Sequence, residues 1–125
     1  MRILCVDDND AILATLKSAF KAAGVDVETA YNGFNALVKI TKNPKSFHAL
    51  MTDLRMPGID GFALIEKSRS IGYAGPIIVY AATISPDDRR RLEDLQVKQM
   101  IEKPARSSEL LAAIRESLGE AAPKT

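Results

Sequence analysis

Short apolar runs rich in β-branched residues alternate along the chain with longer segments in which apolar residues recur every three or four positions. The short runs predict β-strands and the longer segments predict amphipathic α-helices. Helical spacing is clearest at Ile12, Leu16 and Phe20, and again at Leu110 and Ile114. The predicted strands cover residues 3–6, 25–31, 47–52, 77–80 and 97–101.

Polar residues and glycine mark the ends of the predicted helices. Gly24 follows the first helix, whereas Asn32, Asp60 and Ser85 are placed to cap the second, third and fourth. Pro86 suits the first turn of the fourth helix. Strand and helix therefore alternate throughout, which predicts an α/β fold with a parallel sheet covered by helices on both faces. We expect one domain over residues 1–118, followed by a tail or linker over 119–125.

Charged residues follow several of the predicted strands. Asp7 and Asp8 follow the first strand, Asp53 follows the third, and Lys103 follows the fifth. Ligands of open parallel sheets bind at the carboxyl ends of the strands. We therefore expect three carboxylates and one ammonium group to converge at one edge of the sheet.

Carboxylates gathered in this way repel one another unless a cation lies between them. Oxygen ligands without a neighbouring histidine or thiolate favour Mg²⁺ or Mn²⁺ over zinc. An aspartate carboxylate such as that of Asp53 can attack phosphorus to form an acyl phosphate, while Lys103 and a metal neutralise the transferring group. The pattern is therefore suited to phosphoryl transfer.

Composition limits the alternatives. The chain has 125 residues, and 17 basic against 16 acidic side chains give a formal charge of +1, so no global field favours nucleic acid or an anionic membrane. The single cysteine, Cys5, excludes an internal disulfide, and neither a secretion signal nor an apolar run of about 20 residues is apparent. We expect a soluble cytoplasmic protein with no direct nucleic-acid or membrane partner.

The pair Asp7-Asp8, the segment Thr52-Asp-Leu-Arg-Met-Pro-Gly-Ile-Asp-Gly61 and Lys103-Pro104 together resemble a response-regulator receiver domain of two-component signal transduction. The resemblance covers nearly the whole chain. It implies a doubly wound, flavodoxin-like sheet of five parallel strands in the order 2-1-3-4-5, with five helices.

The same resemblance implies a role for each site residue. Asp53 would be the phosphoacceptor and Lys103 would pair with the phosphoryl group. Asp8, Asp53 and the backbone carbonyl of Arg55 would bind Mg²⁺ or Mn²⁺, with Asp7 acting through water. The donor would be a phosphohistidine of a sensor histidine kinase or a histidine phosphotransfer protein, and the output a contact with an unidentified protein. The domain would be a phosphoacceptor and not a turnover enzyme.

Two positions depart from the pattern of the family. Ala81 stands where Ser or Thr usually ends the fourth strand, and Met100 stands where Tyr or Phe is usual. Thr83 is a candidate substitute for the missing hydroxyl. We therefore expect atypical switching, in which phosphorylation perturbs the loops near Asp53 but leaves the helix near residues 87–94 nearly unchanged.

Three other functions remain open. Asp8-Asn9-Asp10 resembles the start of an aspartate-nucleophile phosphohydrolase, although Ala11 and the late Lys103-Pro104 fit that class poorly. A flavodoxin-like electron carrier would need a phosphate-binding loop where Asp7 and Asp8 would repel phosphate. The absence of the usual hydroxyl at position 81 and aromatic ring at position 100 also suits a receiver fold used as a phosphorylation-insensitive interaction module. The presence of Asp7, Asp8 and Asp53 favours a phosphoacceptor instead.

Overall fold

Five strands alternate with five helices in the computed structural model, which describes residues 1–119. The strands are β1 (Arg2–Val6), β2 (Asp26–Ala30), β3 (Ala49–Thr52), β4 (Ile77–Ala81) and β5 (Gln99–Glu102). The helices are α1 (Asp10–Ala22), α2 (Gly33–Lys42), α3 (Gly61–Ser70), α4 (Pro86–Asp94) and α5 (Ser107–Ser117). Apart from Gly119, the predicted tail over 119–125 lies outside the described residues.

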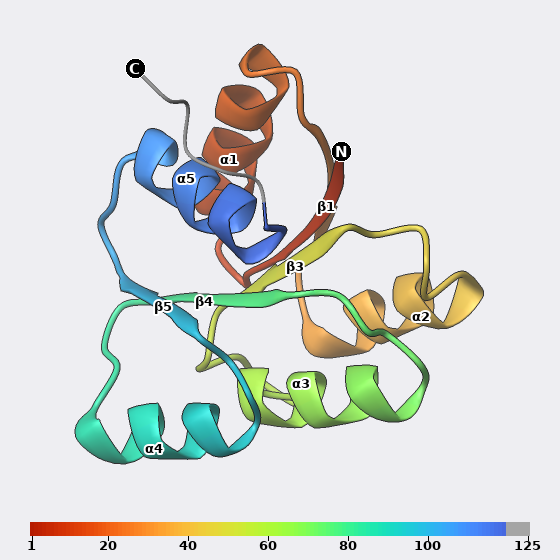
Figure 1. The fold of residues 1–125 in the computed structure, drawn as a ribbon, viewed down its shortest axis with the longest axis vertical. Helices are drawn as coiled ribbons and strands as arrows, with labels where there is room; N and C mark the ends of the chain where they lie inside the picture. Colours follow the sequence, from red (N-terminus) through yellow and green to blue (C-terminus); the bar gives the residue numbers. More distant parts are fainter. Residues whose placement is uncertain (120–125) are drawn as a thin grey trace.

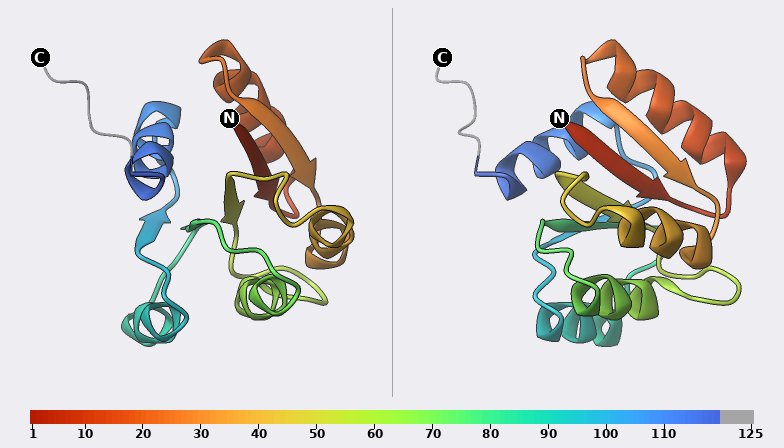
Figure 2. Two further views of the ribbon diagram at one scale, coloured as in Figure 1. Left: turned by 45° about the vertical axis from the view of Figure 1, so that its right-hand side comes forward. Right: turned by 90° about the vertical axis from the view of Figure 1, so that its right-hand side faces the viewer.

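The strands form one parallel sheet in the order β2-β1-β3-β4-β5, as expected. Helices α1 and α5 cover one face, and α2, α3 and α4 cover the other (Figure 1). The same three layers are visible in the turned views (Figure 2). The fold is therefore a doubly wound α/β sandwich in which every connection crosses over a face of the sheet.

Alternate side chains of each central strand enter different halves of the core. In β1, Leu4 belongs to the cluster beneath α2, α3 and α4, whereas its neighbour Cys5 belongs to the cluster beneath α1 and α5. Full burial of a large aliphatic side chain contributes about 1.5–3 kcal/mol, so both layers stabilise the sheet. No helix within residues 1–119 is long and apolar enough to cross a bilayer.

Helix caps hold three of the helix starts at the expected residues. Asn32 Oδ1 accepts a hydrogen bond from the Asn35 amide at 2.7 Å, and Asp60 Oδ1 accepts one from the Ala63 amide at 2.9 Å. Ser85 caps α4, with Pro86 as the first helical residue. Such a cap contributes typically about 1 kcal/mol. These caps begin α2 and α4 shortly after β2 and β4, and begin α3 after the longer loop that follows β3.

Three strands begin later than the sequence predicts. The Val25 amide donates to the Phe20 carbonyl at 2.9 Å, and the Val97 amide donates to the Leu92 carbonyl at 2.9 Å. Both valines therefore close the preceding helix instead of joining a strand. Phe47 is buried in the core but precedes β3, so its apolar character reflects packing and not strand pairing.

Candidate functional site

Asp53 is the first residue after β3, and its backbone amide donates to the Val6 carbonyl of β1 at 3.0 Å. Its Oδ1 atom accepts a hydrogen bond from the Leu54 amide at 2.7 Å, and the residue is only 9% exposed. A Cβ at Gly61 would lie 2.3 Å from the Asp53 carbonyl oxygen, so only glycine permits this approach of α3 to the loop. The backbone therefore fixes both the position and the orientation of the Asp53 carboxylate.

Asp7 is the first residue after β1 and is 3% exposed. Its Oδ1 atom accepts a hydrogen bond from the Asn9 amide at 2.9 Å. Burial raises the pKa of Asp7 above its ordinary value, although hydrogen bonds from Lys103 and Asn9 oppose this effect. Burial therefore makes ionisation of Asp7 less favourable than in water, as is common for carboxylates in functional sites.

Asp8, which is exposed, completes an acidic cluster with Asp7 and Asp53. One carboxylate oxygen from each residue lies within 4.8 Å of the others. Three carboxylate oxygens at this spacing match the ligand preference of Mg²⁺, which also retains waters and binds phosphate oxygens. The donor set therefore fits the predicted metal.

Lys103 supplies the expected positive charge. Its Nζ atom lies 2.6 Å from Asp7 Oδ2 and 3.3 Å from Asp53 Oδ2, and its side chain is 14% exposed. Burial alone would lower the pKa of Lys103, but the hydrogen bond to Asp7 and the charges of both aspartates raise it overall. The ammonium group therefore remains charged beside Asp53. The Lys103-Pro104 peptide bond is cis.

Tyr80 also contacts the site, although nothing in the sequence marks it as a site residue. The ring centroid of Tyr80 lies 5.5 Å from Lys103 Nζ, and its hydroxyl oxygen accepts a hydrogen bond from the Ala105 amide at 3.2 Å. The aromatic face attracts the ammonium group and the hydroxyl holds the following loop. Within an apolar strand, a tyrosine carries no sequence signal that separates this role from core packing.

Comparison with known proteins identifies the family. The family "Response regulator receiver domain" matches residues 3–115. The gliding motility regulatory protein of Myxococcus xanthus is 34% identical over 114 residues, which are 90% of this chain and 14% of that protein. The response regulator MprA of Mycobacterium leprae is 35% identical over 123 residues, which are 98% of this chain and 53% of that protein.

A solved receiver domain from Methanospirillum hungatei superposes with a TM-score of 0.88 at 29% identity, covering 95% of this chain and 94% of that one. This chain belongs to the response-regulator receiver family. It spans about half the length of MprA and a smaller part of the gliding motility regulator.

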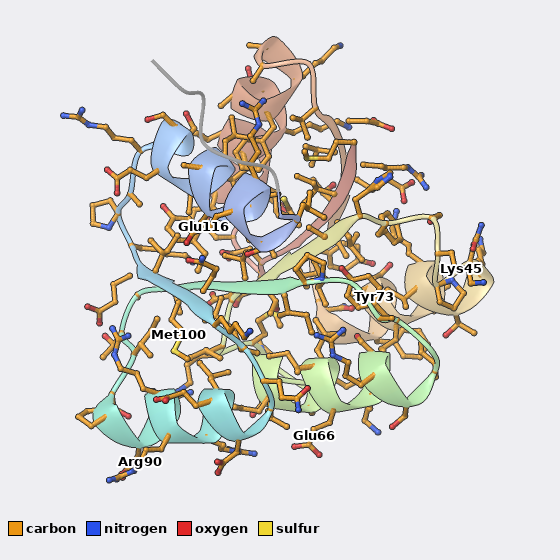
Figure 3. All side chains as sticks on the ribbon, in the orientation of Figure 1. Lys45, Glu66, Tyr73, Arg90, Met100 and Glu116 are labelled. Atoms are coloured by element: carbon orange, nitrogen blue, oxygen red, sulfur yellow. The ribbon has the colours of Figure 1, made fainter. Side chains whose placement is uncertain are left out.

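The two residues that depart from the family pattern, Ala81 and Met100, lie on β4 and β5. Ala81 ends β4, is 2% exposed, and accepts a hydrogen bond from the Lys103 amide at 2.8 Å through its carbonyl. Met100 lies on β5, on the side of the sheet that faces α4 (Figure 3), and contacts the core cluster there. Thr83 is exposed, and no hydrogen bond within residues 1–119 joins it to Asp53. Its role as a substitute hydroxyl stays a prediction.

Arg55 lies on the loop after β3, two residues beyond Asp53. Its side chain extends to α4, where Nη2 lies 3.0 Å from both carboxylate oxygens of Asp88. The family resemblance implies only a metal-binding role for the Arg55 carbonyl, and that role stays a prediction. The contact between Arg55 and Asp88 could not have been predicted from the sequence, because the two residues are 33 positions apart and each has other charged residues near it.

Proposed function

We propose that this receiver domain accepts a phosphoryl group from a phosphohistidine donor onto Asp53 in a reaction that requires Mg²⁺ or Mn²⁺. The observation that carries the proposal is the environment of Asp53 Oδ2. The Leu54 amide binds the other oxygen, Oδ1, at 2.7 Å, whereas Oδ2 lies 3.3 Å from the Lys103 ammonium. Asp53 thus has one oxygen anchored by the backbone and one beside a fixed positive charge and two further carboxylates.

In the proposed reaction, Asp53 Oδ2 attacks the phosphorus atom and forms an O–P bond as the P–N bond to the donor imidazole breaks. The imidazole leaves with the electron pair and takes up a proton. Lys103 neutralises negative charge on the phosphoryl oxygens, and the Leu54 amide keeps the carboxylate aligned. A divalent cation held by Asp8, Asp53 and the Arg55 carbonyl, with Asp7 acting through water, would supply further neutralisation when bound.

Intact-mass spectrometry after incubation with acetyl phosphate and MgCl₂ tests the proposal. The parent should gain one phosphoryl adduct, and Asp53→Asn should gain none. Asp87→Asn, which makes the same chemical change on the exposed first turn of α4, should resemble the parent. Uptake by Asp53→Asn equal to that of the parent would show that the nucleophile is another residue.

Intact mass and an assay for released phosphate together separate the competing functions. A phosphorylation-insensitive interaction module predicts no adduct on the parent with either Mg²⁺ or Mn²⁺. A phosphohydrolase predicts continuous release of phosphate from small esters, whereas an acceptor should stop after one equivalent apart from slow self-dephosphorylation. The proposed acceptor signals by protein–protein contact, with atypical switching because Ala81 lacks a hydroxyl and Met100 lacks an aromatic ring.

A further inference from the structure

The ion pair between Arg55 and Asp88 joins the loop that follows Asp53 to the first turn of α4. Asp88 is buried, with 11% of its side chain exposed, whereas the Arg55 side chain is 65% exposed. The guanidinium carbon of Arg55 also lies 5.8 Å from the ring centroid of the buried Phe62. One end of the pair is therefore fixed in the protein, and the other belongs to the loop at the site.

Asp88 also determines how α4 begins. Its Oδ2 atom accepts a hydrogen bond from the Ser85 amide at 3.1 Å, and its own amide donates to Ser85 Oγ at 3.0 Å. This reciprocal capping box satisfies two backbone amides at the helix start. A change in the position or charge of Arg55 thus acts on a carboxylate that is already part of the α4 cap.

A second contact joins the start of α4 to the other side of the site. The carboxylate of Glu102 accepts a hydrogen bond from the Ile84 amide at 3.0 Å, and Glu102 directly precedes Lys103. The loop before α4 is therefore held by Arg55 through Asp88, and by the Glu102 carboxylate through the Ile84 amide. Neither contact uses the side chain of Ala81 or Met100.

Electrostatics gives the direction of the coupling. Two residues of chain span at most about 7 Å, so the backbone of Arg55 lies close to Asp53. The guanidinium extends to Asp88, so it experiences the charge of the site at longer range, reduced by screening over about 8 Å at physiological ionic strength. Phosphorylation makes Asp53 about one charge more negative, whereas a divalent cation brings two positive charges. The loaded site is therefore less negative than the acidic cluster alone, and it competes less for the Arg55 guanidinium.

We infer that Arg55 is a positioning residue that couples the phosphorylation site to α4 through Asp88. Loading of the site strengthens the Arg55–Asp88 pair, which already lies at 3.0 Å, and holds the start of α4 more firmly against the loop after β3. By linkage, the pair stabilises the loaded state by the same factor. This inference rests on the proposed phosphoacceptor function, and it replaces the expectation that α4 stays nearly unchanged.

The test adds MgCl₂ and beryllofluoride together to the metal-free protein, so that the trifluoroberyllate group stands in for the phosphoryl group on Asp53 and the compared states are the empty and the fully loaded site. Amide chemical shifts report its apparent affinity and the response of α4. Arg55→Gln and Asp88→Asn should each weaken the apparent affinity about three- to tenfold, and the double variant should be no weaker than the single variants. Asp87→Asn, which removes the adjacent charge in the same turn, should stay within about twofold of the parent.

The amide shifts on loading distinguish coupling from a purely structural role of Arg55. In the parent, loading should shift the amides from Ser85 to Leu92. In Arg55→Gln, these shifts should be lost while those near Asp8 and Leu54 persist. If the variants bind beryllofluoride as tightly as the parent and α4 still responds, the coupling is wrong but the phosphoacceptor stands. If the parent itself does not bind beryllofluoride with Mg²⁺, the phosphoacceptor proposal fails.

Discussion

Lys103 Nζ lies 2.6 Å from Asp7 Oδ2, although the two residues are 96 positions apart in the chain. Both side chains are largely buried, and Asp7 is the closer of the two aspartates that Lys103 contacts. A buried charge pair is retained only when its geometry compensates for lost solvation. The pair therefore holds the ammonium group in place beside Asp53 before any phosphoryl group arrives.

Replacing Lys103 with Ala should slow phosphoryl uptake while preserving the fold. Loss of a fixed charge that stabilises developing negative charge costs about 10²-fold in rate. Uptake from acetyl phosphate can be followed by intact mass, with circular dichroism as the check on folding. Lys98→Ala removes an exposed lysine just before β5 and should react at the parent rate. Equal rates for Lys103→Ala and the parent would contradict the proposed role of Lys103.

Asp7→Asn should stabilise the metal-free protein at neutral pH. Burial raises the pKa of Asp7 in the folded state above its ordinary value of 3.8. Ionisation of Asp7 therefore costs folding free energy, and this cost develops as the pH rises from the ordinary pKa through the raised one. A neutral amide of the same shape avoids the cost but removes a carboxylate from the acidic cluster.

Thermal denaturation with and without MgCl₂ measures both effects. At pH 7, Asp7→Asn should unfold at a higher temperature than the parent without Mg²⁺ and gain less from its addition. Asp87→Asn should gain as much from Mg²⁺ as the parent does. A lower unfolding temperature for metal-free Asp7→Asn would mean that its ion pair with Lys103 outweighs the burial of its charge.

The Arg55–Asp88 pair should make stability depend on pH in the acid range. Burial alone would raise the pKa of Asp88, but hydrogen bonds from Arg55 and Ser85 lower it overall. A lowered pKa means that ionised Asp88 stabilises the fold above the ordinary value of 3.8, and that this contribution is lost as the pH falls through the lowered pKa. Because Arg55 is largely exposed, solvent screening reduces the contribution to about 1 kcal/mol.

Urea denaturation of the parent and Asp88→Asn between pH 3 and pH 7 tests this dependence. The difference in unfolding free energy should be constant above about pH 5 and should shrink as the pH falls below the ordinary pKa of Asp88. For Asp87→Asn, the corresponding difference should vary less with pH. A difference between the parent and Asp88→Asn that stays constant down to pH 3 would show that Asp88 is not stabilised as an anion.

The fold was predictable because periodicity, caps and strand ends all indicated the same architecture. Asp7, Asp53 and Lys103 follow strands, so a parallel sheet brings them to one edge whatever the details of packing. The strand order was not derivable from alternation and came only with the family resemblance. The starts of three strands were wrong. Val25 and Val97 have strand-like side chains but donate their amides to a helix, and Phe47 is apolar because it packs in the core.

The contacts between loops were not predictable. The ion pair between Arg55 and Asp88 and the hydrogen bond from the Ile84 amide to Glu102 depend on how far α4 lies from the sheet. Charged residues in loops and on helix surfaces are common, and ion pairs between exposed residues contribute little, so the sequence does not indicate which of them pair. Sequence periodicity predicts which face of a helix or strand a residue occupies, but not which loop residue lies opposite it.

Ala81→Ser should strengthen the response to loading. The hydroxyl missing at Ala81 would bind a phosphoryl oxygen, and a charge-assisted hydrogen bond is worth about 1.5–3 kcal/mol. After the cost of desolvating the hydroxyl, we expect about tenfold tighter binding of beryllofluoride with Mg²⁺. Ala82→Ser places the same group on the next, exposed residue and should leave the affinity at the parent value.

The amide chemical shifts of α4 show why Ala81→Ser would bind beryllofluoride more tightly. If the new hydroxyl draws the loop inward, the shifts at Ser85 and Asp88 on loading should be larger in Ala81→Ser than in the parent. Because this route uses neither Arg55 nor Asp88, Ala81→Ser should restore part of the α4 response when it is combined with Arg55→Gln. Unchanged affinity in Ala81→Ser would show that the side chain at this position does not face the phosphoryl group, and the absent hydroxyl would then not explain atypical switching.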